Sequence, residues 1–263
     1  NKKTIAVKDT ILSLDLLHLE TNRVSCACVH LIPIKLINLG LNLYAYAMAV
    51  SNLSKRGIMV VIEGCDRTGK TTQATQLVKR LNQAGMKCEY MRFPDRGTAI
   101  GNILDLYLNK KIELDDKAVH LLFSANRWEK RSEIEELLSR GIHLIVDRYA
   151  YSGVAFSAAK KGMPLSWCKY ADVGLPCPDT VFFFTLNPHE MDKRPCFGQE
   201  RYEDLDFQAR VFDNYLRLKE NNWKIVDGNK SVESLSNELF DLTKSLIHSS
   251  QDRPFSKLWE KEL

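Results

Sequence analysis

GIMVVIEGCDRTGKTTQATQLVKRLNQAG, residues 57–85, is the stretch that decides the fold of this chain. Residues 57–63 form a short apolar run with several β-branched side chains, and residues 70–85 carry apolar side chains at helical spacing, so the stretch predicts a strand, a turn and a helix. The turn contains Gly64, four further residues, and then the tripeptide Gly-Lys-Thr at 69–71, which is the spacing of a phosphate-binding loop. Because this loop follows a strand and precedes a helix, it predicts a site for a nucleoside triphosphate.

The side chains of this loop have the chemistry that a triphosphate needs. Backbone N–H groups in such a loop turn inward, and the following helix directs its positive end at the same point. Lys70 is expected to reach the outer phosphates, and Thr71 is expected to give its hydroxyl to Mg²⁺. Asp66 and Arg67 stand where an ordinary loop has small residues. The Arg67 guanidinium either lies against the transferring phosphoryl group or pairs with a nearby acid at the surface.

The composition indicates a globular protein with a basic leading segment. The chain has 263 residues, of which 44% are hydrophobic and 27% charged, enough for one buried core. The net charge of +4 resides in residues 1–56, and the remainder has thirty basic and thirty acidic residues. This balance gives no domain-wide basic field, so no nucleic-acid partner is predicted. Seven scattered cysteines form no disulfide framework, which favours a reducing compartment.

Residues 1–56 are interpreted as an N-terminal extension outside the organised core. Within it, residues 24–50 have one formal charge, Lys35, but also a proline and two asparagines, so a membrane-spanning helix is a weak interpretation. A mitochondrial transit peptide is disfavoured by the three acids of the extension. The favoured readings are a peripheral extension, or sequence that is not part of the working protein. The expected location is the cytoplasm, with mitochondrial or nuclear pools as alternatives.

Four further apolar runs predict the remaining strands, and helical spacing lies between them. A parallel sheet covered on both faces has strands that are apolar on both sides and separated by helices. The chain therefore predicts an α/β fold with a five-stranded parallel sheet. The strand runs are 88–93, 142–147, 181–186 and 223–227, and the helical stretches include 116–139, 200–221 and 231–247.

Two arginines follow the ends of predicted strands and suggest a second anion site. The run ending at Phe93 continues to Arg96, and the run ending at residue 146 continues as Asp147-Arg148. Ligands of open α/β sheets bind outside the carboxyl ends of the strands. Arg96 and Arg148 are therefore candidates to clamp a second phosphate, although each is also compatible with an ordinary surface position. Asp147 is placed to hold Mg²⁺ directly or through water.

One helical stretch has the residue types of a nucleobase site. Phe123 and Arg127 are four residues apart, so they lie on one face of a helix. An aromatic ring beside a cation can stack on a base and donate to its carbonyl edge. By itself the spacing also fits a core phenylalanine next to a solvated arginine.

Several motifs in one order resemble those of thymidylate (dTMP) kinases of the eukaryotic kind. They are EGCDRTGKTTQ, RFPDR, VHLLFSANRWE, VDRYAYSGVAF, DVGLPCPD and FGQERYE, and the resemblance covers about residues 57–247. It implies the fold of the P-loop nucleoside monophosphate kinases, with a kinase domain at 57–248, a short lid at about 187–201 and a C-terminal tail at 249–263. The implied reaction transfers the γ-phosphate of ATP to dTMP, giving dTDP and ADP in dTTP biosynthesis. Mg²⁺ is the implied cofactor, and a homodimer is the common assembly.

The resemblance also implies a role for individual residues. Arg96 and Arg148 would hold the dTMP phosphate, Phe123 would stack on thymine, and Arg127 would bond its O4. Asp66 would contact the sugar 3′-hydroxyl, and Tyr202 with Phe156 would crowd the 2′ position. Arg67 would be the catalytic arginine of the loop, and Arg194 of the lid would approach the nucleotide.

The expected catalytic residues are Asp66, Arg67, Lys70 and Arg148. The expected ATP-binding residues are Gly64, Arg67, Thr68, Gly69, Lys70, Thr71, Thr72 and Arg194. The expected dTMP-binding residues are Asp66, Phe93, Arg96, Phe123, Arg127, Arg148, Gly153, Phe156 and Tyr202, and the metal ligands are Thr71 and Asp147.

Two other function classes stay open at the level of sequence. The first is a small-molecule kinase for a deoxynucleoside or a different monophosphate; a nucleoside acceptor would need a carboxylate base instead of the second arginine clamp. The second is a nucleotide-binding switch with little catalysis, which would bind ATP without producing ADP when dTMP is added. A phosphate acceptor is already anionic, so catalysis would rest on positioning and charge neutralisation by Lys70, Arg67 and Arg148.

Overall fold

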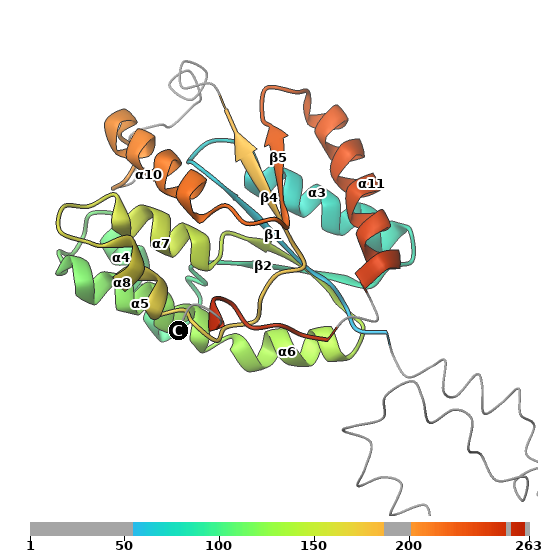
Figure 1. Cartoon of the computed structure of the whole chain (residues 1–263), viewed down its shortest axis with the longest axis horizontal. Coiled ribbons are helices and arrows are strands. Elements are labelled where there is room, and N and C mark those ends of the chain that lie inside the picture. Colours follow the sequence, from blue (N-terminus) through green and yellow to red (C-terminus); the bar gives the residue numbers. More distant parts are fainter. Residues whose placement is uncertain (1–54, 187–200, 251–253, 261–263) are drawn as a thin grey trace, which may run out of the picture. The chain divides into compact units, whose positions relative to one another are not determined.

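The central sheet has five parallel strands in the order β2-β3-β1-β4-β5 (Figure 1). The computed structural model of the chain describes residues 55–186, 201–250 and 254–260. Each of the five runs that predicted a strand overlaps one to within one or two residues, so the predicted α/β fold with a five-stranded parallel sheet is confirmed. The strands are β1 (Met59–Gly64), β2 (Cys88–Arg92), β3 (His143–Asp147), β4 (Thr180–Thr185) and β5 (Trp223–Asp227).

Helices connect successive strands and cover both faces of the sheet. They are α3 (Lys70–Gln83), α4 (Ala99–Leu108), α5 (Asp116–Trp128), α6 (Arg131–Ser139), α7 (Ala150–Ala158), α8 (Leu165–Tyr170), α10 (Leu205–Leu218) and α11 (Val232–Ser250). None of these helices has both the length and the hydropathy that a membrane span needs.

The stretch 116–139, expected to be helical, consists of two helices with a break at Glu129 and Lys130. At the break, the Glu129 carboxylate accepts a hydrogen bond from Thr98, and the Lys130 ammonium lies 3.0 Å from Asp95. Both partners belong to the loop after β2. Tertiary contacts therefore mark the break, and no glycine or proline in the sequence announces it.

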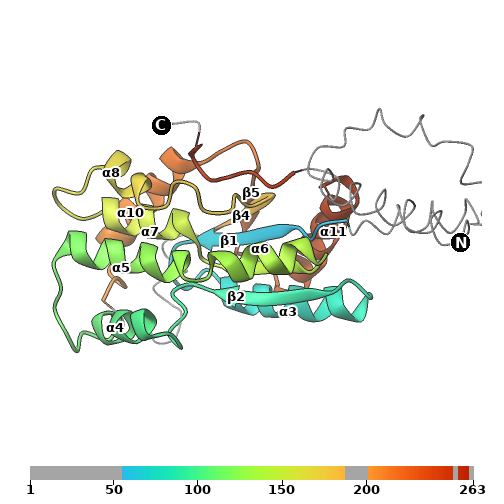
Figure 2. The same ribbon diagram turned by 90° about the horizontal axis from the view of Figure 1, so that it is seen from below.

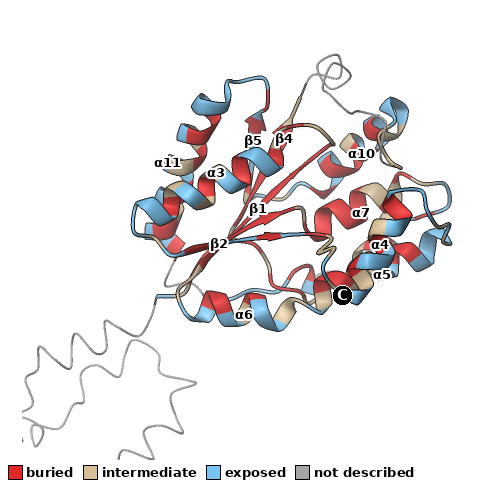
Figure 3. Cartoon of the chain, turned by 180° about the vertical axis from the view of Figure 1, so that it is seen from behind, coloured by how far each residue is buried: buried red, intermediate tan, exposed pale blue. Residues whose placement is uncertain are grey.

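The two faces of the sheet build two separate parts of the core. In β1, Met59 and Val61 pack with residues of α6, α7 and α10. The alternate residues, Val60 and Ile62, pack with α3 and α11. All six residues of β1 are buried, and Figure 3 shows β1 in the colour of buried residues, because helices cover both sides of a central parallel strand. Figure 2 shows α4 and α5 on the side towards which the strands run.

The described end of the chain returns to the core of the fold. Leu258 and Trp259 are buried, and the Trp259 ring lies 5.5 Å from that of Tyr151 in an edge-on contact. The backbone N–H of Leu258 donates to the carbonyl of Leu175 at 2.8 Å. These residues belong to the stretch expected to be a C-terminal tail, and a few apolar residues without periodicity gave no signal of their packing.

The chain is also fastened to the fold just before β1. The Arg56 guanidinium donates to both carboxylate oxygens of Asp179, at 2.9 and 2.6 Å, and the N–H of Met59 donates to the same carboxylate. Arg56 is the last residue of the expected N-terminal extension. The ordered fold therefore includes at least this residue of the extension.

Candidate functional site

A cavity of about 590 Å³ lies where the loops after β1, β2 and β3 meet. Its walls bring together fourteen of the residues predicted from sequence. They are Asp66, Arg67, Gly69, Lys70, Thr71, Thr72, Phe93, Arg96, Phe123, Arg127, Arg148, Gly153, Phe156 and Tyr202. Gly64, Thr68 and Asp147 are not among the residues that line this cavity, and Arg194 lies outside the described residues.

The loop after β1 turns sharply because three of its residues have left-handed backbone angles. Gly64, Arg67 and Gly69 have φ angles of 143°, 61° and 93°. A Cβ atom at Gly64 would lie 2.5 Å from the carbonyl oxygen of Phe184, so only glycine fits there. The loop leads directly into α3 at Lys70, as the spacing of the glycines predicted.

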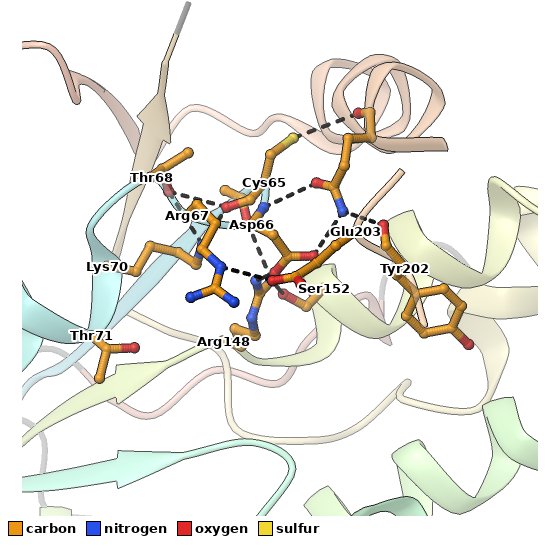
Figure 4. A network of polar contacts seen from close by, with 12 residues as sticks. Cys65, Asp66, Arg67, Thr68, Lys70, Thr71, Arg148, Ser152, Tyr202 and Glu203 are labelled. Atoms are coloured by element: carbon orange, nitrogen blue, oxygen red, sulfur yellow. Dashed lines mark hydrogen bonds and ion pairs between the residues drawn. The ribbon is translucent and has the colours of Figure 1, made fainter. Parts of the chain in front are cut away.

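The Lys70 side chain folds over this loop and is buried (Figure 4). Its ammonium donates to the carbonyl oxygen of Cys65 and to the Thr68 hydroxyl, the latter at 3.2 Å. Burial, followed by the positive charge of Arg148, lowers the pKa of Lys70 to about 8. The site thus holds a cation in an environment that disfavours its charge, so an incoming phosphate would be electrostatically favoured.

Arg67 is held at the cavity wall by an acid. Its Nε donates to Glu203 Oε1 at 2.8 Å, and the Glu203 side chain is only 5% exposed. Figure 4 shows the two side chains meeting beside Lys70. Of the two sequence interpretations, the structure shows the pairing with an acid, but this acid lines the cavity and lies two residues after the stretch 187–201. The guanidinium is therefore within the site and not on an outer surface.

Arg148 joins the loop to the second part of the cavity. It forms an ion pair with Asp66 and donates to the carbonyl oxygen of Gly64 at 3.2 Å. The amide of Gln208 fixes Asp66 from the other side, donating to its carboxylate at 2.7 Å and accepting from its N–H at 3.0 Å. Arg148 also lies over the Phe156 ring, 5.2 Å from its centroid. Asp66 and Arg148, predicted from separate strands, are thus in direct contact.

The two remaining predicted arginines have acidic partners as well. Arg96 lies 2.7 Å from Asp105 of α4. Arg127 is 2% exposed and donates to both oxygens of Asp172, at 3.0 and 2.6 Å. A Cβ atom at Gly153 would lie 2.6 Å from an Arg127 nitrogen, so the glycine leaves room for this guanidinium. Arg127 is therefore a rigid buried group and not a solvated side chain.

Aromatic rings form the flank of the cavity next to these arginines. The rings of Tyr202 and Phe207 stack with centroids 5.1 Å apart, and Phe156 meets Tyr202 edge-on at 5.7 Å. The Tyr202 hydroxyl donates to that of Tyr107 at 3.1 Å. Phe123 of α5 packs among partly buried apolar neighbours in the same region. These contacts fix the rings, which give the cavity an apolar flank beside its charged residues.

Asp147 and Thr71 provide oxygen atoms suited to a hard cation. The Thr71 hydroxyl donates to Asp147 Oδ2 at 2.5 Å, and Tyr90 donates to the same oxygen at 3.1 Å. The other oxygen, Oδ1, is buried without a hydrogen-bond partner among the described residues. No cluster of three or more potential metal-binding side chains occurs in the described part of the chain. The pair therefore fits Mg²⁺, which commonly takes one or two protein ligands plus phosphate and water.

The partners of the predicted charged residues are the residues that sequence reasoning missed. Three acids lie 9 to 136 positions from the arginine that each contacts, and Gln208 lies 142 positions from its partner Asp66. They stand on elements that meet only in the folded chain, so no local spacing marks them. Glu203 belongs to the motif FGQERYE, which was its one available signal. The missed partners are Asp105, Asp172, Glu203 and Gln208.

Comparisons with known proteins agree with this geometry. A family model described as thymidylate kinase matches residues 62–239. The thymidylate kinase of Homo sapiens is 47% identical over 210 residues, covering 79% of this chain and 99% of the relative, and that of Danio rerio is 46% identical, covering 78% and 98%. A solved structure of thymidylate kinase from Candida albicans has a TM-score of 0.70 at 36% identity, covering 77% of this chain and 98% of the other.

Proposed function

The chain belongs to the thymidylate kinase family and transfers the γ-phosphate of ATP to dTMP, giving dTDP and ADP, and we propose that the cavity described above holds both substrates. The observation that carries this proposal is that one cavity is lined both by the phosphate-binding loop and by Arg96 and Arg148. In a kinase the two phosphates must meet without water between them, so two anion sites in one cavity are what the reaction requires.

The proposed ATP site is the loop and the start of α3. Its backbone N–H groups and the positive end of α3 would face the triphosphate, with Gly64, Thr68 and Gly69 shaping the loop. Lys70 would exchange the Cys65 carbonyl for a phosphate oxygen. Thr72 follows on the cavity side, and Arg194 of the proposed lid at 187–201 would approach from the segment outside the described residues.

The proposed dTMP site lies between the arginines and the aromatic rings. Arg96 and Arg148 would hold the phosphate, with Phe93 supporting the loop of Arg96. The base would lie against Phe123 and receive a hydrogen bond from Arg127, whose fixed position beside Gly153 supports this role. Asp66 would contact the 3′-hydroxyl of the sugar. Phe156 and Tyr202 would fill the space of a 2′-hydroxyl, in keeping with their fixed ring contacts.

The reaction that this arrangement supports needs no general base. A phosphate oxygen of dTMP is already anionic and would attack the γ-phosphorus in line with the leaving group. Lys70, Arg67 and Arg148 would neutralise charge as it spreads over the transferring group. Thr71 and Asp147 would hold Mg²⁺, directly or through water, and the ion would neutralise phosphate charge when bound. A closing lid would limit hydrolysis, the competing reaction.

A coupled assay of ADP formation tests the assignment. Purified protein with ATP and dTMP should turn over rapidly, whereas thymidine, which has no phosphate for Arg96 and Arg148, should be a poor acceptor. UMP should also be a poor acceptor because its 2′-hydroxyl would meet Phe156 and Tyr202. The turnover of dUMP relative to dTMP measures the contribution of the thymine methyl group. Thymidine turned over as fast as dTMP would remove the assignment, and ATP binding without ADP formation would favour a switch.

The Phe123→Ala variant tests the base site. Stacking on an aromatic ring contributes about 1–3 kcal/mol per base, so the KM for dTMP should rise roughly 5- to 160-fold. The KM for ATP should change less than about 2-fold, because Phe123 lies away from the phosphate-binding loop. Steady-state kinetics with each substrate varied in turn measures both values. Equal damage to the two KM values would contradict the stacking role.

The Asp147→Asn variant tests the metal site. The amide keeps the shape of the side chain but removes the negative charge, so half-saturation by Mg²⁺ should move to a concentration about 10-fold higher or more. Titration of the activity with MgCl₂ at fixed ATP measures this shift, and a direct measurement of Mg²⁺ binding to the ATP complex serves as a second readout. An unchanged midpoint in both would place the metal elsewhere.

We also propose that the kinase domain spans about residues 57–248 and that the protein acts as a homodimer. Family resemblance supports the dimer, together with exposed Ile103, Leu106 and Leu121 on the packed helices α4 and α5. Apolar side chains in such positions are suited to contact another chain. Sedimentation analysis of the full chain distinguishes a dimer from a monomer.

A further inference from the structure

Glu63, near the carboxyl end of β1, is a fully buried carboxylate that has no part in the reaction described above. A buried carboxylate is costly unless hydrogen bonds compensate it. The residue lies directly before the phosphate-binding loop and beneath the start of α7. The position of Glu63 next to the site and the free-energy cost of burying its carboxylate together suggest that it has a function.

Four donors converge on the two oxygens of Glu63. The N–H groups of Tyr149 and Ser152 donate to Oε1, at 2.9 and 3.1 Å. The hydroxyls of Ser152 and Tyr215 donate to Oε2, at 2.5 and 2.9 Å. Donors of this number suit an ionised carboxylate, which accepts and does not donate. Glu63 therefore fixes the first turn of α7, which begins two residues after Arg148.

Ser152 connects this carboxylate to the catalytic arginine. Arg148 Nη1 donates to the Ser152 hydroxyl at 3.1 Å, and Figure 4 shows the two side chains side by side. A serine hydroxyl has one proton and two lone pairs. When its proton points to Glu63, a lone pair remains for Arg148. Arg148 can only donate, so Glu63, by accepting the Ser152 proton, orients the Ser152 hydroxyl to accept from Arg148.

The backbone at Arg148 needs this support. Its φ angle of 67° lies in the left-handed region, which a residue with a side chain adopts at a cost of about 1 kcal/mol or more. The adjacent N–H of Tyr149 is one of the four donors to Glu63. Glu63 thus holds Arg148 twice, through the backbone of the next residue and through the Ser152 hydroxyl.

We propose that Glu63 is a positioning residue that aims the Arg148 guanidinium at the substrate phosphates. It acts through Ser152 and the first turn of α7 and does not touch either substrate. The inference rests on the role proposed above for Arg148. It explains why a buried charge is retained beneath the site.

The negative charge of Glu63 lowers the stability of the folded chain. This effect on stability distinguishes a positioning role from a purely structural one. Burial raises the pKa of Glu63, against the lowering effects of Ser152, Arg148, the Tyr149 N–H and Tyr215. A carboxyl whose pKa is raised on folding binds its proton more tightly in the folded state, so stability falls as pH rises from the unfolded pKa to the higher folded pKa. Replacing the carboxylate by a neutral amide should therefore leave stability at neutral pH unchanged or raise it.

The test compares Glu63→Gln with Tyr215→Phe in kinetics and thermal unfolding of the full chain. Glu63→Gln is expected to lower kcat/KM for dTMP about 10- to 100-fold, as for a lost hydrogen bond to a charged group, without lowering Tm. Tyr215→Phe removes one donor to Glu63 and the 2.8 Å contact between the Tyr215 and Ser152 hydroxyls, but it keeps the charge and the hydrogen bond from Ser152 to Glu63, so kcat/KM should change less than about 3-fold. Glu63→Gln with unchanged kinetics, or with a loss equalled by Tyr215→Phe, would overturn the proposal.

A double-mutant cycle with Arg148→Lys identifies the path of the effect. If Glu63 acts through Arg148, adding Glu63→Gln to Arg148→Lys lowers kcat/KM by much less than it does in the wild-type chain. If the fold-losses in kcat/KM of the two single variants multiply fully in the double variant, the inference is overturned, but the role of Arg148 is left intact. An Arg148→Lys variant as active as wild type would instead show that the directed contacts of Arg148 have no function, which removes the premise of this inference. Should Glu63→Gln not fold, Ser152→Ala breaks the same link and is expected to show the same loss; full activity there overturns the proposal.

Discussion

The Arg67→Ala variant is expected to lower kcat at least about 100-fold, with a much smaller effect on the KM for ATP. An arginine at the transferring phosphoryl group is worth about 10³- to 10⁵-fold in other enzymes of this chemistry, and the expectation is set below that range because Lys70 and Arg148 remain. In the structure the Arg67 guanidinium is paired with Glu203 and lines the cavity. It would therefore exchange one anionic partner for another as the phosphates bind.

A parallel Glu203→Gln variant tells catalysis from structure. It breaks the same ion pair but keeps the guanidinium, so a loss caused only by a disturbed loop would appear in both variants. Initial rates at saturating ATP and dTMP give kcat, and thermal unfolding checks that each protein is folded. An Arg67→Ala enzyme within a few-fold of wild type would show that the arginine only pairs with its acid.

The Arg148→Ala variant is expected to lower kcat/KM for dTMP about 100- to 1000-fold. Loss of one group aimed at developing charge costs this much in other enzymes. Arg148 contacts Asp66 and the Gly64 carbonyl, and its guanidinium is the proposed link between the two phosphates. Both kcat and the KM for dTMP should therefore change, whereas the KM for ATP should change less.

The Arg148→Lys variant is the matched control for charge. A lysine keeps the positive charge but lacks the fork of donors, so it should recover only part of the loss. Full recovery would show that a point charge is sufficient and that the directed contacts with Asp66 and Ser152 have no function. An Arg148→Ala enzyme that keeps its dTMP KM would place the acceptor phosphate elsewhere.

The fold was predictable from the sequence because its main signals are local. Five apolar strand runs and the helical spacing between them can be read within short windows, and the phosphate-binding loop fixes which end of the sheet holds the site. Arg96 and Arg148 were found for the same reason, since each closely follows the end of a strand. The break at residues 129–130 was missed because contacts with the loop after β2, and not glycine or proline, define it.

The electrostatics of the cavity could not be predicted in the same way. The partner acid of Arg127 is Asp172 on a distant part of the chain, and that of Arg67 is Glu203. Nothing in the spacing of these residues shows that they meet. Burial is equally hidden: Arg127 reads as a solvated helix residue in sequence but is 2% exposed because α5 packs against its neighbours. The sequence thus indicates which cations serve the site, whereas their fixed positions follow only from tertiary structure.

A crystal structure of the full chain with ADP, Mg²⁺ and dTMP tests the central claim, that two phosphate sites face each other in one cavity. The account predicts ADP on the loop at 64–71 and the dTMP phosphate within hydrogen-bond distance of Arg96 and Arg148, open towards the ADP. A dTMP molecule bound outside this cavity, or with Arg96 and Arg148 turned into solvent, would contradict it.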